Sequence, residues 1–442
     1  MGGLPRRATF IRQETSDGIG TIILDSGNFT AAKALPEQSL EPAAAKAALI
    51  LKAMDLMGYA AVAVGEKDLY LGLGRLRSLE ETAKVTFLSA NVTDRKGHHI
   101  FEPFALLRAG DVTVGVIGLT APPADRDLFS RRAAGAVVRD PAKAVREAVD
   151  SIGKKCDLIV LLSNVGYAKD LELAEKVPGI DILISGGTKR FMNRPLIREK
   201  TLITTGYYEG RAVGGLLVHQ DGAVRGWVSR KELDFLDRQI SAAEAKADSP
   251  VGREKVDALL RSRNISSERT LYEPEMVNLD PSIPDDPGMV ALIIRYRQEL
   301  LNSSVGPSGP VTGNVEQVRY TGSGACAGCH ASRHRFWLTT GHSRAFESLA
   351  PKKAGADPDC IGCHVTGYMQ RTGYWPKAPR DDLRGVQCEA CHGVGSLHVR
   401  SPEMYSLVHL PASPQCMDCH TGEQDDDFDY FRDKPLVCAE AE

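Results

Sequence analysis

The stretch Cys388-Glu-Ala-Cys391-His392-Gly-Val-Gly395-Ser-Leu-His398 decides how the C-terminal part of this chain must fold. Two thiols separated by two residues can form thioethers to both vinyl groups of one haem, and the imidazole of the next residue then reaches the iron. The same spacing occurs four times after residue 319, so the sequence predicts four covalently attached c-type haems. The four copies are Cys326, Cys329 and His330; Cys360, Cys363 and His364; Cys388, Cys391 and His392; and Cys416, Cys419 and His420.

Zinc sites and a disulfide framework are two other interpretations of these cysteines. Zinc sites use Cys-x-x-Cys pairs two at a time and do not need a histidine directly after every pair. A disulfide framework leaves the histidines unexplained. The haem interpretation therefore rests on the repetition of the motif rather than on any single copy.

Four more histidines lie in the same region, which equals the number of predicted haems: His334, His342, His398 and His409. They are the candidates for the distal side of the iron, and two imidazoles per iron favour electron transfer because no coordination position stays open. The alternative is that one or two of them are surface histidines. His334 follows His330 by one helical turn, so it points from the same face and could reach only a neighbouring haem.

The stretch from Tyr320 to about Tyr430 resembles the tetrahaem cytochrome c family whose best-known member accepts electrons from hydroxylamine oxidoreductase. The shared features include Thr366-Gly367-Tyr368 after the second motif and Gly385-Val-Gln before the third. The resemblance implies that His342 and His398 are distal ligands and that one haem is five-coordinate. Relatives carry a histidine where this chain has Cys438, which is a free thiol, a haem ligand, a disulfide half or a solvent-exposed cysteine near the end of the chain.

The first part of the chain alternates short apolar runs with amphipathic stretches, which is typical of an α/β layered domain. Strands are expected at 21–24, 60–64, 85–90, 111–119, 157–163 and 181–184, and helices at 41–57 and 141–156. Segments 201–208 and 214–228 are expected to finish the sheet as antiparallel strands that turn at Asp221-Gly222, followed by helices at 237–262 and 285–302. The domains are expected at 1–236 (α/β), 237–303 (helical extension), 304–318 (linker) and 319–442 (a mostly α, loop-rich multihaem domain).

The front domain resembles the metallophosphoesterase domain of 5'-nucleotidases, through Leu24-Asp25-Ser-Gly27-Asn28, Leu88-Ser-Ala-Asn91 and Val177-Pro-Gly-Ile-Asp181. Enzymes of that family need Asp, Asn and His around two metal ions, which polarise the phosphate and activate water. The corresponding positions have changed, so we expect no dinuclear metal, no phosphatase activity and a role as scaffold or docking surface. The vestigial positions are Asp25, Asn28, Glu66, Lys67, Asn164, Gly187 and Lys189.

Relative to that family the first strand is missing before Gly2-Gly3-Leu4, and no hydrophobic signal segment precedes it. Covalent haem attachment by this motif implies export to an oxidising compartment outside the cytoplasm, the periplasm or the cell surface. We therefore expect the true start of the protein, with its signal peptide, upstream of Met1.

The composition fits a water-soluble globular protein. The 442 residues are 43% hydrophobic and 25% charged, with a formal net charge of -3, so a nucleic-acid partner is not expected. Apolar runs are too short for a transmembrane segment. The leading hypothesis is an extracytoplasmic tetrahaem electron carrier that serves redox partner proteins, other multihaem cytochromes among them. The alternatives are a haem enzyme that reduces a small inorganic substrate at a five-coordinate haem, and a phosphoesterase with a redox domain.

Overall fold

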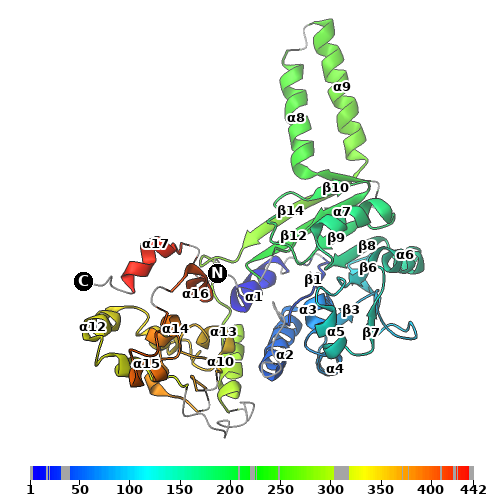
Figure 1. Cartoon of the computed structure of the whole chain (residues 1–442). Helices are drawn as coiled ribbons and strands as arrows, with labels where there is room; N and C mark the ends of the chain where they lie inside the picture. The colour runs from blue at the N-terminus through cyan, green and yellow to red at the C-terminus, as the bar shows by residue number, and fades with distance from the viewer. Residues whose placement is uncertain are drawn as a thin grey trace. The chain divides into compact units, whose positions relative to one another are not determined.

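The computed structural model divides the chain into two compact units, Met1–Val290 and Ala291–Glu442 (Figure 1). It describes residues 3–437 except 16–17, 19, 31–39, 208–209, 220–223, 225, 247–248, 303–317, 371, 377, 409–410, 422–424 and 426. The candidate ligand His409, Cys438, the turn at Asp221-Gly222 and nearly all of the expected linker lie outside the described residues.

The first unit is built on a six-stranded sheet with the order β10-β11-β9-β8-β6-β5. Its four inner strands are parallel, and β5 and β10 close the edges as antiparallel strands. The inner strands are buried apolar runs, as expected for a sheet covered on both faces. The bounds are β5 Phe104–Ala109, β6 Val112–Leu119, β8 Leu158–Ser163, β9 Ile182–Ser185, β10 Leu196–Arg198 and β11 Thr201–Thr204.

Three smaller sheets complete the β structure of this unit. They are the parallel sheet of β1 Ile23–Asp25, β2 Tyr59–Ala63 and β3 Thr86–Leu88; the sheet of β12 Ala212–His219, β14 Thr270–Asn278 and β13 Trp227–Ser229; and the pair β4 Val92–Asp94 and β7 Ala136–Val138. Val116, Leu162, Trp227 and Tyr272 belong to one buried cluster that joins the six-stranded sheet to the first two of these sheets. The unit is therefore layered, with apolar side chains between its sheets.

Helices cover the outer face of the large sheet. The buried side chains of α6 (Pro141–Ile152) share a second cluster with β6, β8 and β9. This helix begins where Asp140 accepts a hydrogen bond from the Lys143 N–H, with Pro141 in the first turn. The other helices before residue 180 are α1 Leu4–Glu14, α2 Leu40–Met57, α3 Glu66–Leu69, α4 Leu73–Thr82, α5 Arg126–Arg132 and α7 Tyr167–Lys176.

The end of this unit differs from the expected pattern. Segment 201–204 pairs in parallel with β9, and β12 and β13 both flank β14 instead of pairing with each other. The expected helix at 237–262 is two helices, α8 Arg230–Glu244 and α9 Pro250–Ser267, which lie side by side as an antiparallel pair (Figure 1). The stretch expected to be a helical extension also contains β14, whose Pro274 and charged residues hide the strand pattern.

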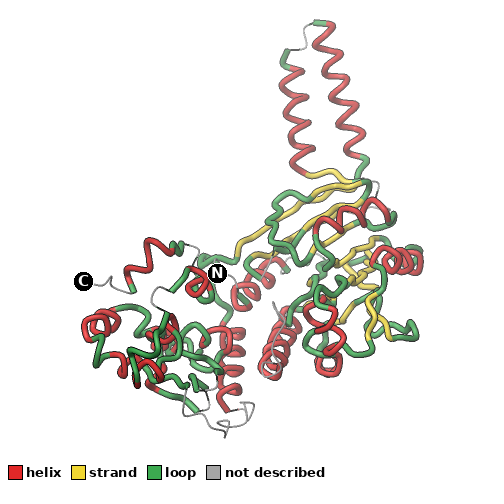
Figure 2. The backbone as a smooth tube through the Cα atoms, in the orientation of Figure 1, coloured by secondary structure: helices red, strands yellow, loops and turns green. Residues whose placement is uncertain are grey.

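The second unit consists of short helices joined by long loops, so the expected mostly α, loop-rich architecture is confirmed (Figure 2). Its buried apolar cluster is small, with Tyr320, Leu349, Ile361, Val365 and Tyr374 among its members, and so short a segment needs additional core material. The elements are α10 Pro287–Asn302, which begins in the first unit, then α11 Ser323–Cys326, α12 Ala331–Thr339, η2 Ala345–Leu349, α13 Pro358–Ile361, η3 Asp381–Leu383, α14 Cys388–His392, α15 Ser396–Arg400, α16 Ser413–Met417, α17 Tyr430–Asp433 and η4 Lys434–Leu436.

In the described part of the chain, none of the helices combines the length and the apolar character needed to cross a lipid bilayer.

Candidate functional site

Each of the four Cys-x-x-Cys-His motifs begins in a one-turn helix, formed by α11, α13, α14 and α16. A helical turn places residues three and four positions apart on the same face, so both thiols and the following imidazole of each motif can address one ligand. All eight motif cysteines are free thiols. This is the arrangement that covalent attachment of haem requires.

The motifs lie next to each other in two pairs. The thiols of Cys326 and Cys388 share a hydrogen bond, which together with burial raises the pKa of Cys326. A second hydrogen bond joins Cys363 to Cys419 and lowers the pKa of Cys363 to about 7. The first motif is therefore adjacent to the third, and the second to the fourth.

Two pairs of imidazole rings lie close together in the second unit. The ring centroids of His330 and His398 are 6.3 Å apart with the planes inclined by 15°, and those of His342 and His420 are 5.9 Å apart at 49°. Bonds from imidazole nitrogen to metal are about 2 Å long, so two rings on opposite sides of one metal ion have centroids roughly 6 Å apart. Both pairs have this separation.

Three histidines of the second unit have a hydrogen bond at Nδ1, which leaves their Nε2 atom available to a metal. The Nδ1 atoms of His364 and His392 lie 2.6 Å and 2.5 Å from the carbonyl oxygens of Ala345 and Val408. The same contact holds His398, 2.7 Å from the carbonyl oxygen of Tyr405. A carbonyl can only accept, so Nδ1 carries the proton, as is usual for metal-bound histidine.

Burial and the neighbouring His420 both lower the pKa of His342, which favours the neutral imidazole that binds metals. The donor set of the second unit thus fits c-type haem. His334 contacts the ring of Trp337, with centroids 5.6 Å apart. Among the described residues, no second imidazole faces His364 or His392.

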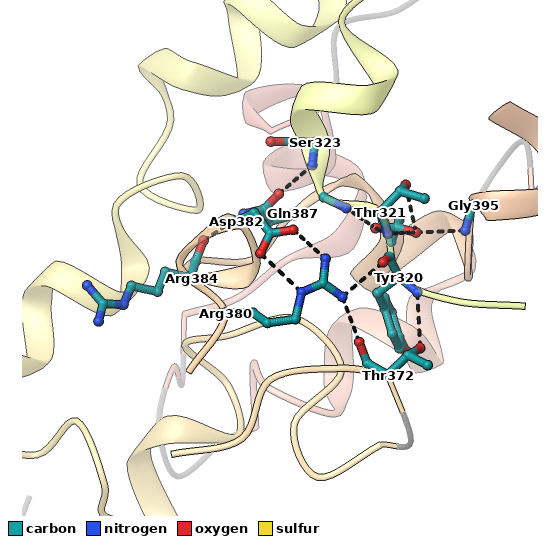
Figure 3. A network of polar contacts seen from close by, with 11 residues as sticks. Tyr320, Thr321, Ser323, Thr372, Arg380, Asp382, Arg384, Gln387 and Gly395 are labelled. Carbon is teal, nitrogen blue, oxygen red and sulfur yellow. Dashed lines mark hydrogen bonds and ion pairs between the residues drawn. The ribbon is translucent and has the colours of Figure 1, made fainter. Parts of the chain in front are cut away.

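The segment that leads into the first motif, with Thr321 and Ser323, is held by side chains in and just before the third motif (Figure 3). Glu389 is 2% exposed and accepts hydrogen bonds from the backbone N–H groups of Thr321, Gly322 and Gly395 at 2.9, 2.8 and 2.7 Å. The neighbouring Gln387 side chain accepts from the Ser323 N–H at 2.6 Å. These contacts explain why Cys326 and Cys388 lie together. Glu389 is not among the residues predicted from the sequence, although a charged residue inside a haem motif is a signal.

Four of the positions expected to be vestigial phosphoesterase ligands come together around two asparagines in the first unit. The Asn28 amide donates to the Asn164 side-chain oxygen at 2.8 Å and accepts from the Lys67 N–H at 2.9 Å. Gly187 lies beside Asn164, since a Cβ there would be 3.9 Å from its carbonyl oxygen. These four positions therefore share one place at the carboxyl ends of β1, β2, β8 and β9.

Two further positions of this set, Glu66 and Lys189, lie outside the group around the two asparagines. The Glu66 carboxylate accepts from Tyr70 and from the Ala124 N–H at 2.6 Å, which ties it to the loop after β6. Lys189 is exposed. Asp25 accepts from the Gly27 N–H at 2.8 Å. Burial raises the pKa of Asp25, and the electrostatic interaction with Arg7 offsets part of this rise.

The donors at this site do not fit a pair of metal ions. They are amides and backbone groups, and the described residues contain no group of three His, Cys, Asp or Glu side chains arranged to hold a metal. Two buried carboxylates nearby, Asp68 and Asp170, are not among the residues predicted from the sequence. Asp68 accepts from Asn28, Thr30 and Gly65, and Asp170 from two serines, so both serve the local fold. Burial raises the pKa of each to about 6.

Comparison with known proteins identifies both units. The family model "Cytochrome c554 and c-prime" matches residues 325–393, which include the first three haem motifs. Cytochrome c-554 of Nitrosomonas europaea is 40% identical over 91 residues, covering 17% of this chain and 39% of that protein. The C-terminal part therefore carries a cytochrome c554 domain, which supports c-type haem and electron transfer.

The N-terminal part matches 5'-nucleotidases and metallophosphoesterase structures. Protein UshA of Escherichia coli (strain K12) is 30% identical over 339 residues, covering 70% of this chain and 57% of that protein. The structure of the sulfate thiohydrolase SoxB of Thermus thermophilus superimposes with a TM-score of 0.52 at 19% identity, covering 67% of this chain and 47% of SoxB. The first unit thus has the calcineurin-like phosphoesterase fold, as expected. The chain spans well under two thirds of each of these proteins.

Proposed function

We propose that this protein is an extracytoplasmic tetrahaem electron carrier whose phosphoesterase-like unit has no hydrolytic activity. The observation that carries the proposal is the pair of facing imidazole couples, His330 with His398 and His342 with His420, at the separation that one metal ion between them needs. Haem c supplies iron that takes up and releases one electron. The chain would supply the eight thiols that attach the groups and, for two of the four haems, a pair of imidazoles that could bind the iron.

The contacts between motifs support transfer along the unit. The side chains of Cys326 and Cys388 lie next to each other, as do those of Cys363 and Cys419, so the first motif is close to the third and the second is close to the fourth. Electrons therefore have short routes within each pair. Redox partner proteins, other multihaem cytochromes among them, are the proposed donor and acceptor.

Mass and visible spectra of the full chain test the proposal directly, on protein exported with the haem-maturation machinery. We expect the denatured mass to exceed that of the polypeptide by four haems, and the reduced spectrum to show sharp low-spin bands. An unmodified mass with bound zinc would refute it. Attachment of three haems would exclude the fourth motif, which lies outside the matched family region.

The proposal that the first unit is catalytically inactive rests on the amide pair of Asn28 and Asn164, which occupies the place of acidic and histidine metal ligands. We expect no release of phosphate from nucleotides or model phosphate esters with Mn²⁺, Mg²⁺ or Zn²⁺ added. Metal-dependent turnover at this site would instead support a phosphoesterase with a redox domain. The unit is proposed to act as scaffold or docking surface.

A second candidate function follows from the haem that His364 would hold. Among the described residues, no imidazole lies opposite His364. The haem of the second motif therefore has one protein ligand for its iron in the described part of the chain. A five-coordinate haem can bind a small inorganic molecule. A shift of the ferrous spectrum on addition of carbon monoxide or nitric oxide favours such a reductase, whereas an unchanged spectrum favours the carrier.

A further inference from the structure

The histidine of the fourth motif differs from the others in the group that holds its ring. The Nδ1 atom of His420 lies 2.7 Å from Oδ2 of Asp425, and the ring of Phe428 stacks on the same imidazole with centroids 4.5 Å apart. The ring of His342 is also a neighbour, with its centroid 5.9 Å from that of His420. His420 is thereby fixed in orientation by a carboxylate and an aromatic ring.

The other motif histidines with an Nδ1 partner face neutral groups. His364 and His392 donate to the backbone carbonyl oxygens of Ala345 and Val408. In the described part of the chain, His420 is the motif histidine whose Nδ1 faces a carboxylate. A charge-assisted hydrogen bond is roughly twice as strong as a neutral one.

A carboxylate at Nδ1 draws the ring proton toward itself and makes Nε2 a stronger electron donor. A stronger donor stabilises ferric iron more than ferrous iron, so it lowers the reduction potential. The proton stays in the hydrogen bond throughout, and the only change at the metal is the gain or loss of one electron. The effect is confined to the haem bound by this histidine.

Building on the proposed function, we infer that Asp425 is a positioning residue that lowers the reduction potential of the haem held by the fourth motif. It does so through the hydrogen bond to His420 rather than by general surface charge. The haem at His330 and His398 and the haem at His342 and His420 then differ in reduction potential. Among the described residues, a carboxylate contacts a histidine of the second pair only. The difference gives electron flow a direction within the unit.

The test replaces Asp425 in the full haem-loaded chain and follows each haem by potentiometric titration with electron paramagnetic resonance detection. In Asp425→Asn we expect the ferrous-to-ferric ratio of one haem at fixed ambient potential to rise about tenfold, because a charge-assisted hydrogen bond becomes a neutral one. Asp425→Glu keeps the carboxylate and restores most of the low potential. His342→Ala identifies the affected haem, because it converts the same signal to high spin.

Asp427→Asn is the matched control. Asp427 carries the same charge two residues away, its side chain is 87% exposed, and it pairs with Arg432 rather than with a histidine. An equal shift in Asp427→Asn would overturn the hydrogen-bond mechanism, and so would unchanged potentials in Asp425→Asn. If the denatured mass shows that the wild-type chain carries no haem, the proposed function fails instead.

Discussion

The buried Asp170 gives the first unit a pH dependence of stability that can be worked out from its surroundings. The carboxylate, on α7, is fully buried at the ends of β8 and β9, and it accepts hydrogen bonds from the hydroxyls of Ser163, at 2.5 Å, and Ser185. These two bonds do not offset the loss of water, so burial raises its pKa to about 6. An unfolded aspartate has a pKa of about 3.9.

The sign follows from the protons bound in each state. Between about pH 4 and pH 6 the folded chain holds a proton at Asp170 that the unfolded chain has lost, so the free energy of unfolding falls as the pH rises. The contribution is fully present below pH 4 and lost above pH 6. A difference of about two pKa units corresponds to about 3 kcal/mol.

Asp170→Asn removes the titration and keeps the contacts. The amide oxygen accepts from Ser163, and the amide nitrogen donates to the Ser185 hydroxyl, which can rotate to accept. We therefore expect the stability of the variant relative to wild type to rise by about 3 kcal/mol from pH 4 to pH 7.

Denaturant unfolding of the full chain, followed by the fluorescence emission of Trp227, measures this difference. Trp227 is buried in the first unit, whereas the other tryptophans lie in the second unit, the haem unit. Asp150→Asn, which removes a carboxylate from the exposed face of α6, controls for the loss of one charge. A difference curve for Asp170→Asn that is flat, or that falls with pH, would refute the reasoning.

Three further predictions concern the haem unit and the amide site. His398→Ala removes one imidazole of the pair that it forms with His330, so one haem should change from low to high spin in the oxidised spectrum. His334→Ala should leave the spin states unchanged. The reverse result would contradict the pairing of His330 with His398. Glu389→Gln should lower the free energy of unfolding of the haem unit by about 2 kcal/mol, because the amide nitrogen cannot accept and at least one of the three backbone N–H groups loses its acceptor. The exposed Glu347→Gln serves as control in the same thermal melts. Chelators should leave the unfolding midpoint reported by Trp227 unchanged, because bound metal would otherwise add to stability; a lower midpoint with EDTA would indicate a metal site.

The sequence predicted well those features that local pattern determines. The parallel strands of the large sheet appear as continuous apolar runs, and β6, β8 and β9 lie within about two residues of the expected positions, because both faces of these strands are buried. The boundary between α8 and α9 was missed, although Ser249-Pro250 is a helix start in which Ser249 accepts from the Gly252 N–H. The charged residues on both sides continued the helical pattern and hid this signal.

Contacts between distant segments could not be predicted in the same way. The spacing of the motifs gives no information on which imidazole faces which, because His330 and His398 are brought together by the loops between them. The same limit applies to Asp425, since a carboxylate five residues after a motif histidine is common on a solvated loop. Only the folded chain shows that its oxygen meets Nδ1 of His420.

The amide pair in the first unit explains how a phosphoesterase fold can stay folded with a changed metal site. In the resembling family an acidic residue and a histidine take these two places, and metal ions satisfy their lone pairs. Two amides are complementary instead, since one donates and the other accepts at 2.8 Å. The Asn28 oxygen also accepts from the Lys67 N–H. Under the proposed function, hydrogen bonds of the chain itself take the place of metal coordination here, so the unit can keep its shape without bound metal.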